Sequence, residues 1–368
     1  MNSRVHRRRF GIIYIPVFAV LGLFALDKLV LLQSVRECCT KYGGVNAYRA
    51  SLNYEFPGAE AMRQAAQTGK KIALNFGTSP SFGYYVAPSP EQIAASPHLS
   101  FDDRELLTQW EIFNQAYAGA SMLTAFVRVY QWLDHGVRPD LIMVEISPAA
   151  LNQNNIWYES ELQNGVPLDF MFRHIADMYP AHVAFVLRSR LIAVTRFRPG
   201  IPETAALNFE NLRNEVAVFT DARPRGIPLP GGTRPGEESP FERGRNEFIL
   251  MNMRRQMFSD YRMEPGFARY LERIANRASR EKIPLLFWFP PTHPGGLAVM
   301  REALDSPEWK ERVRKIQELG AVYVDLNEPG VLRCDYFQDP VHVDPRCIPE
   351  IAARKLSRLR ASGLSRYE

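Results

Sequence analysis

The chain has 368 residues, of which 46% are hydrophobic and 23% are charged, as expected of a globular protein with a sizeable core. Its formal net charge is +5, and four arginines among the first nine residues account for most of that excess. A nucleic-acid-binding domain needs a basic face on the folded body, so this charge distribution argues against nucleic acid as a partner.

The N-terminal segment has the pattern of a membrane anchor. Residues 10–26 form an uninterrupted apolar run of 17 residues, the lower limit for a spanning helix. Apolar residues beyond Asp27 and Lys28 extend the run to residue 32. A buried core helix is the alternative, but it must accommodate four arginines at its start. A signal peptide cut after Ala25 would place the bulky Leu23 at a position where signal peptidase prefers a small residue.

Arginines ahead of an apolar run predict a cytoplasmic N-terminus and an exported body. We therefore expect a protein of the inner (cytoplasmic) membrane with a single-pass anchor and a periplasmic C-terminal domain. The expected parts are a cytoplasmic tail at 1–9, a transmembrane helix at 10–32, a juxtamembrane connector at 33–68 and an α/β domain at 69–368.

Short apolar runs alternate with helical patterns along the rest of the chain. The predicted strands are Ile72–Phe76, Ile112–Gln115, Leu141–Ile146, Leu285–Phe289 and Ala321–Leu326. The predicted helices between and after them lie at about 101–110, 122–135, 267–283, 308–319 and 349–359. This alternation predicts an α/β fold with a parallel sheet of five strands and right-handed crossovers.

Residues 151–262 interrupt this alternation. They include an arginine-rich amphipathic stretch at 185–197 and a loop rich in Pro, Gly, Arg and Glu at 221–245. We interpret the segment as a helical and loop insertion over the sheet, carrying a lid or a partner surface. A disordered excursion is the alternative for the loop.

Candidate catalytic residues follow the predicted strands. Ser79 comes just after the first strand and Gly77, and Asp339 and His342 lie in the loop after the fifth. Chemistry in α/β sheets collects beyond the carboxyl ends of the strands. A serine hydroxyl needs a base to take its proton, and the base needs an acid to orient it. The pattern predicts Ser79 as nucleophile, His342 as base and Asp339 as the orienting acid.

Each of these residues also has a structural interpretation. Ser79 could be only a helix N-cap, with Ser81 as a less favoured nucleophile. Asp339 could be a turn former, since it precedes a proline. His342 could be a hydrogen-bonded structural histidine, in which case His293 competes for the role of base.

The four cysteines fit an oxidising compartment. Cys334 and Cys347 flank the proposed acid and base and could close a disulfide that restrains their loop. We expect Cys38 and Cys39 to be free or to pair elsewhere. The alternative is that all four cysteines are unrelated thiols. The cysteine spacing matches no zinc pattern, and no His/Asp/Glu cluster has ligand spacing, so we expect no metal and no cofactor.

The first and last of these motifs resemble those of the SGNH, or GDSL-type, hydrolase superfamily. Gly77-Thr78-Ser79 matches the first block, with Thr78 where aspartate is usual. Asp339-Pro340-Val341-His342 matches the last block closely. The resemblance covers residues 70–150 and 280–360, and it implies a three-layer, flavodoxin-like SGNH fold with a five-stranded parallel sheet.

The middle blocks match less well. Residues 114–121 resemble the second block, in which Gly119 would supply a backbone N–H to the oxyanion. Residues 144–149 align with the third block, but Ala149 stands where the family has its oxyanion asparagine. Asn152, Asn154 or Asn155 could take over that role from a nearby loop.

With its expected anchor, the chain also looks like the membrane-anchored SGNH-like proteins of cell-envelope modification. These are the D-alanyl-transfer protein of teichoic-acid modification and the proteins of polysaccharide O-acetylation. The resemblance implies acyl transfer through an acyl-serine on Ser79, with backbone N–H groups of Ser79 and Gly119 holding the oxyanion. It implies a membrane-bound O-acyltransferase as partner and an envelope polysaccharide or lipid as substrate. The alternative is a catalytically weakened SGNH-fold scaffold that binds such an acyltransferase.

Overall fold

The computed structural model describes residues 3–29, 31–32, 62, 64, 66–78, 80–81, 88–116, 120–155, 162, 165–193 and 232–363. The chain divides into two compact units. The first comprises Met1–Glu55, Gln163–Gly165 and Pro180–Ile227, and the second comprises Phe56–Leu162, Val166–Tyr179 and Pro228–Glu368.

A parallel sheet forms the centre of the second unit. Its strands are β1 (Lys71–Phe76), β2 (Trp110–Asn114), β3 (Leu141–Glu145), β4 (Leu285–Phe289) and β5 (Val322–Asp325). They lie in the order β2-β1-β3-β4-β5, and every neighbouring pair is parallel. This is the strand order of flavodoxin-like folds, so the predicted α/β class and five-stranded parallel sheet are confirmed.

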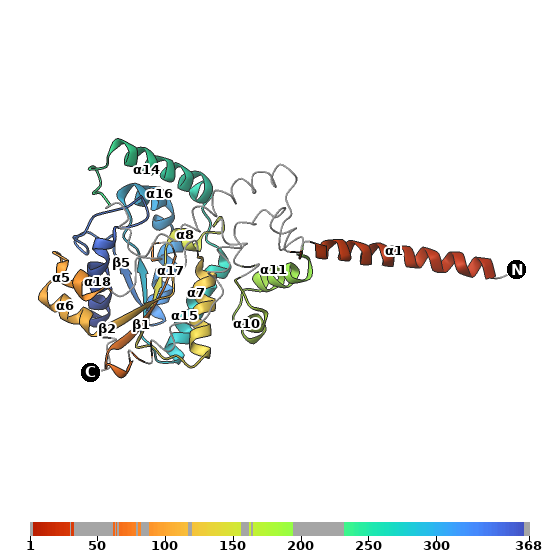
Figure 1. The fold of residues 1–368 in the computed structure, drawn as a ribbon, viewed down its shortest axis with the longest axis horizontal. Coiled ribbons are helices and arrows are strands. Elements are labelled where there is room, and N and C mark those ends of the chain that lie inside the picture. Colours follow the sequence, from red (N-terminus) through yellow and green to blue (C-terminus); the bar gives the residue numbers. More distant parts are fainter. Residues whose placement is uncertain are drawn as a thin grey trace. The chain divides into compact units, whose positions relative to one another are not determined.

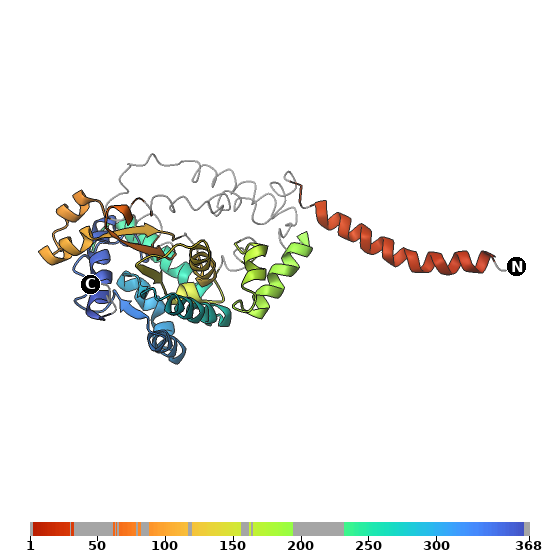
Figure 2. The same cartoon turned by 90° about the horizontal axis from the view of Figure 1, so that it is seen from below.

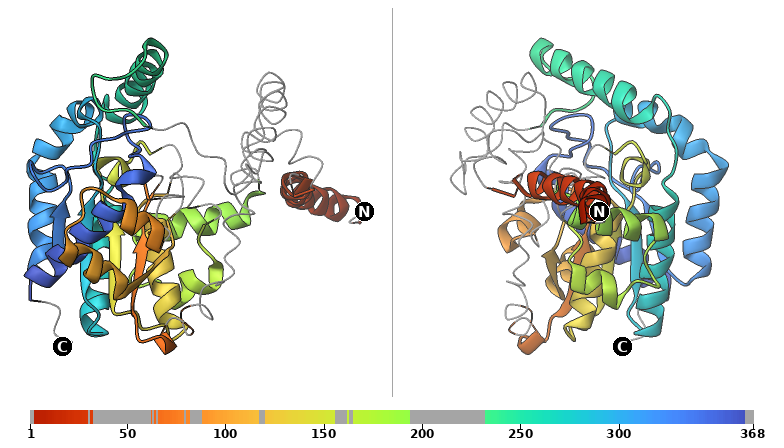
Figure 3. Two further views of the ribbon diagram at one scale, coloured as in Figure 1. Left: turned by 60° about the vertical axis from the view of Figure 1, so that its left-hand side comes forward. Right: turned by 90° about the vertical axis from the view of Figure 1, so that its right-hand side faces the viewer.

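Helices cover both faces of the sheet (Figure 1). On one face α18 (Ile348–Ala361) packs against α6 (Phe101–Thr108), with α5 (Pro90–Ala95) beside it. On the other face lie α7 (Met122–Asp134), α15 (Pro265–Arg280) and α17 (Pro307–Glu318). Figures 2 and 3 show the same layering from other sides. Strands enclosed in this way are continuous apolar runs, and every residue of β3 and β4 is buried.

Local sequence signals set the ends of the helices. Ser121 caps α7 by accepting a hydrogen bond from the N–H of Leu123, and Ser100 forms a capping box at the start of α6. Gly136 and Gly320 follow α7 and α17 with φ of 78° and 87°, a left-handed conformation that lets the chain turn into the next strand.

Helices α14 and α16 lie where the sequence pattern predicted no individual helix. α14 (Pro240–Asn252) begins inside the loop predicted at 221–245 and continues into the π-helical turn η1 (Met253–Phe258). α16 (Pro294–Asp305) follows β4. Both begin with proline at the first helical position, where the missing N–H costs nothing, so proline marked helix starts rather than loops. The prediction of a loop as far as residue 245 was wrong.

Two short helices complete the second unit. α8 (Pro148–Leu151) follows β3 directly, and α10 (Leu168–Arg173) comes later in the region predicted as an insertion. Ser147 starts α8 by accepting a hydrogen bond from the N–H of Ala150. The chain therefore turns sharply at the carboxyl end of β3.

The first unit contains α1 (Ser3–Leu29) and α11 (Pro180–Leu191). Within this unit, Lys28 Nζ donates to the carbonyl of Leu191 at 2.6 Å, and Asp27 accepts the N–H of Ala193 at 2.8 Å. No helix in the described part of the chain has both the length and the apolar character of a membrane span.

Candidate active site

Asp339 and His342 form a hydrogen-bonded acid–base pair in the loop after β5. His342 Nδ1 lies 2.7 Å from Asp339 Oδ2, and the backbone N–H groups of Val341 and His342 donate to Asp339 Oδ1 at 2.8 and 2.9 Å. Both carboxylate oxygens are engaged, so the imidazole is fixed in orientation with its proton on Nδ1. In this tautomer Nε2 carries no proton, so Nε2 is the nitrogen that can accept one. The sequence motif therefore folds into the local arrangement that a base and its orienting acid require.

The electrostatics of the pair keep its acid ionised. Burial raises the pKa of Asp339, but the hydrogen bond and charge of His342, with the two backbone N–H groups, outweigh burial and lower it overall. An ionised carboxylate can stabilise the imidazolium that forms when His342 accepts a proton. Each of the two side chains is 22% exposed, so solutes can reach the pair.

The loop that carries the pair is closed by a disulfide. Cys334 and Cys347 are joined with an S–S distance of 2.02 Å and a Cα–Cα distance of 5.3 Å. The pairing considered from the sequence is therefore present. Phe337 forms an isolated β-bridge to Val343 within the loop and another to Thr233, which joins the loop to the segment ahead of α14. These constraints restrict the orientations open to the acid–base pair.

The turn that contains the proposed nucleophile is anchored on Glu145. Ser79 and Gly119 themselves lie outside the described residues, so their roles stay predictions. On one side of residue 79, the N–H and hydroxyl of Thr78 donate to the Glu145 carboxylate at 3.0 and 2.5 Å. On the other side, the hydroxyl of Ser81 donates to Oε2 of the same carboxylate. Glu145, the last residue of β3, thus fixes both flanks of the turn.

Glycine is needed at the start of this turn. A Cβ on Gly77 would come within 2.4 Å of Ser81 Oγ and 2.5 Å of Glu145 Oε2. Ser81 is completely buried with its hydroxyl held by Glu145, which gives it a structural role and argues against it as the nucleophile.

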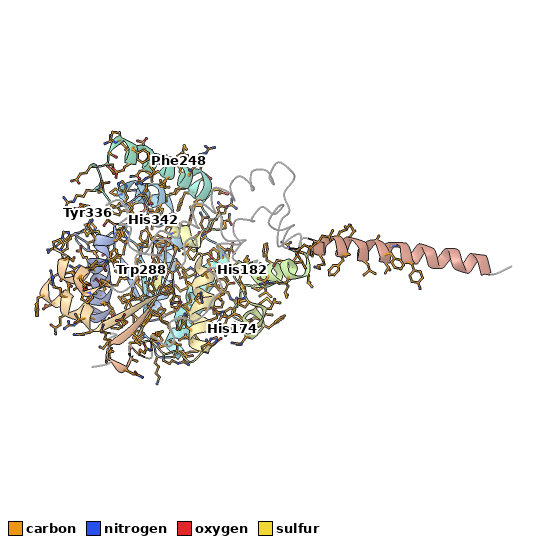
Figure 4. All side chains as sticks on the ribbon, in the orientation of Figure 1. His174, His182, Phe248, Trp288, Tyr336 and His342 are labelled. Carbon is orange, nitrogen blue, oxygen red and sulfur yellow. A yellow bond between two sulfur atoms is a disulfide. The ribbon has the colours of Figure 1, made fainter. Side chains whose placement is uncertain are left out.

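The turn and the acid–base pair share one electrostatic environment. Burial raises the pKa of Glu145, while hydrogen bonds from Ser81 and Thr78 and the charge of His342 act in the opposite direction. His342 influences Glu145 although 197 residues separate them (342 − 145). The fold therefore brings the loop that carries His342 near the carboxyl end of β3, where Glu145 pairs with Trp288 of β4. Figure 4 labels His342 and Trp288.

Lys355 is a buried charged group that the sequence analysis missed. It is 1% exposed on α18, with Nζ 4.0 Å from the centre of the Trp288 ring and 3.4 Å from Asn75 Oδ1. Burial lowers the pKa of Lys355 to about 7, and the negative charge of Glu145 opposes that shift. The available sequence signals were a glutamate ending an apolar strand and a lysine on the apolar face of a helix.

Asparagines connect this lysine to the turn. Asn75 Nδ2 donates to Asn114 Oδ1 at 3.1 Å, and Asn114 Nδ2 donates to the carbonyl of Ser81 at 2.8 Å. Asn75 and Asn114 are paired residues of β1 and β2. A polar network thus extends beneath the turn from Lys355 to Ser81, and its hydrogen bonds restrict how the turn can move.

His293, the alternative base, has both ring nitrogens in structural contacts. Nδ1 accepts the N–H of Gly295 at 3.1 Å and so caps α16, while Nε2 lies 3.1 Å from Glu238 Oε1. The ring also packs edge-on against Phe337. These contacts argue for a capping role at α16.

Two of the asparagines considered as substitutes for Ala149 bind backbone carbonyls. Asn152 Nδ2 donates to the carbonyl of Met257, and Asn154 Nδ2 donates to that of Asp260 at 2.9 Å. These amides connect the region after α8 to η1 and to Asp260, two residues beyond the end of η1. Asn155 Nδ2 lies 3.5 Å from the carbonyl of Ala149 itself. No group of three or more His, Cys, Asp or Glu side chains suited to a metal ion occurs among the described residues.

Comparison with known proteins finds no curated protein and no solved structure that matches. One family model matches residues 7–359, which is nearly the whole chain and includes both the turn of Ser79 and the Asp339–His342 pair. The chain therefore belongs to the family described as "protein of unknown function (DUF1574)".

Proposed function

We propose that this protein is a membrane-anchored, extracytoplasmic SGNH-like serine acyltransferase or esterase that acts on hydroxyl groups of cell-envelope glycans or lipids. The observation that supports it best is the 2.7 Å pairing of His342 Nδ1 with Asp339 Oδ2, in the electrostatic environment of the Glu145-anchored turn. An oriented imidazole with an ionised acid behind it is the arrangement that activates a serine hydroxyl.

In the proposed mechanism, Ser79 Oγ attacks the carbonyl carbon of an acyl donor while His342 Nε2 takes the hydroxyl proton. Backbone N–H groups of Ser79 and Gly119 hold the developing oxyanion. The tetrahedral intermediate breaks its bond to the leaving group, which receives the proton from His342, and an acyl-serine remains. Asp339 stays ionised throughout and stabilises the imidazolium.

The second half of the reaction repeats these steps with an acceptor. His342 removes a proton from a sugar, polyol or lipid hydroxyl, or from water, and the resulting oxygen attacks the acyl-serine carbonyl. The bond to Ser79 Oγ breaks, and the serine regains its proton from His342. The outcome is transfer when the acceptor is an alcohol and hydrolysis when it is water.

The proposed setting follows from the N-terminal sequence and the cysteines. Arginines ahead of an apolar run favour a single-pass anchor with the body on the periplasmic side, and the Cys334–Cys347 disulfide is typical of such an oxidising compartment. A membrane-bound O-acyltransferase would supply the acyl group from the same membrane. No cofactor is needed for this chemistry.

Covalent labelling with a fluorophosphonate tests the proposal. The wild-type chain is expected to be labelled and Ser79→Ala is not. His342→Ala is expected to react on the order of a hundredfold more slowly or worse, because it removes the general base. His293→Ala is the matched control for loss of a histidine and is expected to react like the wild type.

Thermal unfolding of each variant separates loss of chemistry from loss of fold. A folded Ser79→Ala variant that is labelled as fast as the wild type would exclude the acyl-serine mechanism. Folded His342→Ala that reacts normally, with His293→Ala inactive, would transfer the role of base to His293. Measuring acyl transfer to a soluble oligosaccharide against release into water then distinguishes a transferase from an esterase.

A second candidate function is a binding or scaffold protein on a catalytically weakened SGNH fold, partnering a membrane O-acyltransferase. It is favoured by Ala149 in place of the oxyanion asparagine and by the backbone bonds of the Asn152 and Asn154 amides. One missing oxyanion donor costs on the order of a hundredfold to a thousandfold in rate. Cells carrying Ser79→Ala that keep normal envelope modification would support the scaffold, and loss of the modification would exclude it.

A further inference from the structure

Helix α14 turns large apolar side chains toward solvent. Phe241 is 78% exposed, Phe248 is 61% exposed and Met251 is 43% exposed. Spacings of seven and three residues place the three on one face of the helix. Gly244 lies on the same face, and a Cβ there would meet no atom within 4 Å. A surface helix normally buries its apolar side, so this stripe (Phe241, Phe248 and Met251) needs an explanation.

The apolar stripe is not a product of a loosely held helix. Ser239 and Glu242 form a capping box at its start, and Asn246 is buried on the opposite face. Arg245 donates to the carbonyl of Gln338, which is in the loop of the acid–base pair. Figure 4 shows Phe248 on α14, in the same part of the unit as His342. The stripe is therefore presented by a helix fixed to the body.

Exposed arginines occur on α14 and directly after it, in η1. Arg243, Arg254 and Arg255 are exposed, and none of these guanidinium groups has an ion-pair partner among the described residues. Glu247 is the exposed acid on α14, since Glu242 is used in the capping box. Unpaired arginines beside exposed aromatic residues attract an anionic partner that also offers an apolar phase.

From this geometry we infer that the apolar stripe of α14, with Arg243 on α14 and Arg254 and Arg255 on η1, contacts an anionic lipid surface. A single helix held on the outside of the body presents a ridge, which suits a planar bilayer interface. Its phenylalanines and methionine would enter the acyl boundary while Arg243, Arg254 and Arg255 bind headgroup phosphates. This contact is independent of the proposed acyl transfer, and it would hold the His342 side of the unit next to the membrane.

Depth-sensitive fluorescence on the full chain in vesicles tests the inference. Phe248→Cys carries an environment-sensitive fluorophore in a background in which Cys38 and Cys39 are serine and the disulfide stays oxidised. Phe101→Cys is the matched control, because Phe101 is 79% exposed but is followed by two aspartates. The vesicles contain either phosphatidylcholine alone or a mixture with phosphatidylglycerol.

At position 248 we expect a blue-shifted emission that lipid-borne quenchers suppress, in anionic vesicles and not in neutral ones. Replacing Arg254 and Arg255 by glutamine is expected to reduce the shifted fraction about tenfold, since each basic group near an anionic surface contributes to binding. The control position is expected to show neither effect.

Other outcomes would overturn the inference. They are no change at 248 in anionic vesicles, equal changes at 248 and 101, or a shift in both kinds of vesicle. A shift that depends on protein concentration without lipid would assign the stripe to a second copy of the chain. A shift that requires an added protein would assign it to a protein partner.

Discussion

The buried ammonium group of Lys355 makes stability depend on pH in a way that one substitution can isolate. Lys355→Met keeps the length of the side chain and its apolar contacts with Trp288, and removes the titrating group. In the folded chain, burial lowers the pKa of Lys355 to about 7 from its ordinary value of 10.5, although the charge of Glu145 opposes the shift.

The direction of the effect follows from proton binding. Between about pH 7 and pH 10.5, the unfolded chain holds a proton on Lys355 that the folded chain has released. The unfolded state then binds more protons, so the free energy of unfolding rises with pH through this window. Each pH unit contributes about 1.4 kcal/mol, which amounts to about 3 kcal/mol between about pH 7 and pH 9.5.

Guanidinium denaturation of the wild type and Lys355→Met at these two pH values measures the effect. Since all other ionisable groups are common to both chains, their contributions largely cancel in the difference between the two free energies of unfolding. We expect the wild-type value minus the variant value to increase by about 3 kcal/mol on going to the higher pH. Lys70→Met, which removes a lysine that is 42% exposed and paired with Glu111, is the control. A difference that does not change with pH would refute the reasoning.

Two further predictions concern the loop of the acid–base pair and its neighbour. The double substitution of Cys334 and Cys347 by serine opens a loop with a sequence separation of 13 and is expected to lower the free energy of unfolding by about 3 kcal/mol. Denaturation with and without reductant measures it, and a loss well below 1 kcal/mol in both experiments would contradict the entropic argument. His293→Ala removes the N-cap of α16 and is expected to cost about 1 kcal/mol in the same assay. A variant as stable as the wild type would show that the cap contributes little.

The central sheet could be predicted from the sequence because its strands are enclosed by helices. Strands buried on both faces are continuous apolar runs, and β4 was predicted with the bounds it has, Leu285–Phe289. β2 starts at Trp110, two residues earlier than expected. The polar Glu111 separates Trp110 from the apolar run that begins at Ile112. The element type was clear from the apolar runs, and a strand end was missed where a partly exposed polar residue, Glu111, interrupts the run.

The missed helices share a physical cause. α14 and α16 each begin with proline, and α16 has two glycines in its first turn. Proline and glycine are disfavoured in helix interiors, so a segment that contains both residues suggests a loop. The capping groups that start these helices are Ser239 and His293, and their hydrogen bonds depend on the folded positions of the chain.

In the candidate site, too, some residues could be predicted from the sequence and others could not. Asp339 and His342 were found because their interaction spans a single turn, between residues three positions apart in the sequence. Glu145 and Lys355 were not paired, because their proximity depends on the strand order and on the placement of α18 against the sheet. Nothing local in the sequence indicates which buried lysine accompanies which buried glutamate.

The buried charges of Glu145 and Lys355 are better explained by geometry than by stability. Removing two charges from water is costly, and well-packed apolar residues in their place are often equally stable or more so. An apolar residue at 145 would, however, leave the N–H and hydroxyl of Thr78 and the hydroxyl of Ser81 without the acceptor they now share. Those donors stand on either side of residue 79, so the carboxylate determines the shape of that turn. Below about pH 7, where Lys355 keeps its proton, its positive charge lies close enough to interact with the carboxylate of Glu145. Glu145 is therefore best understood as the group that fixes Thr78 and Ser81, with Lys355 as its buried neighbour.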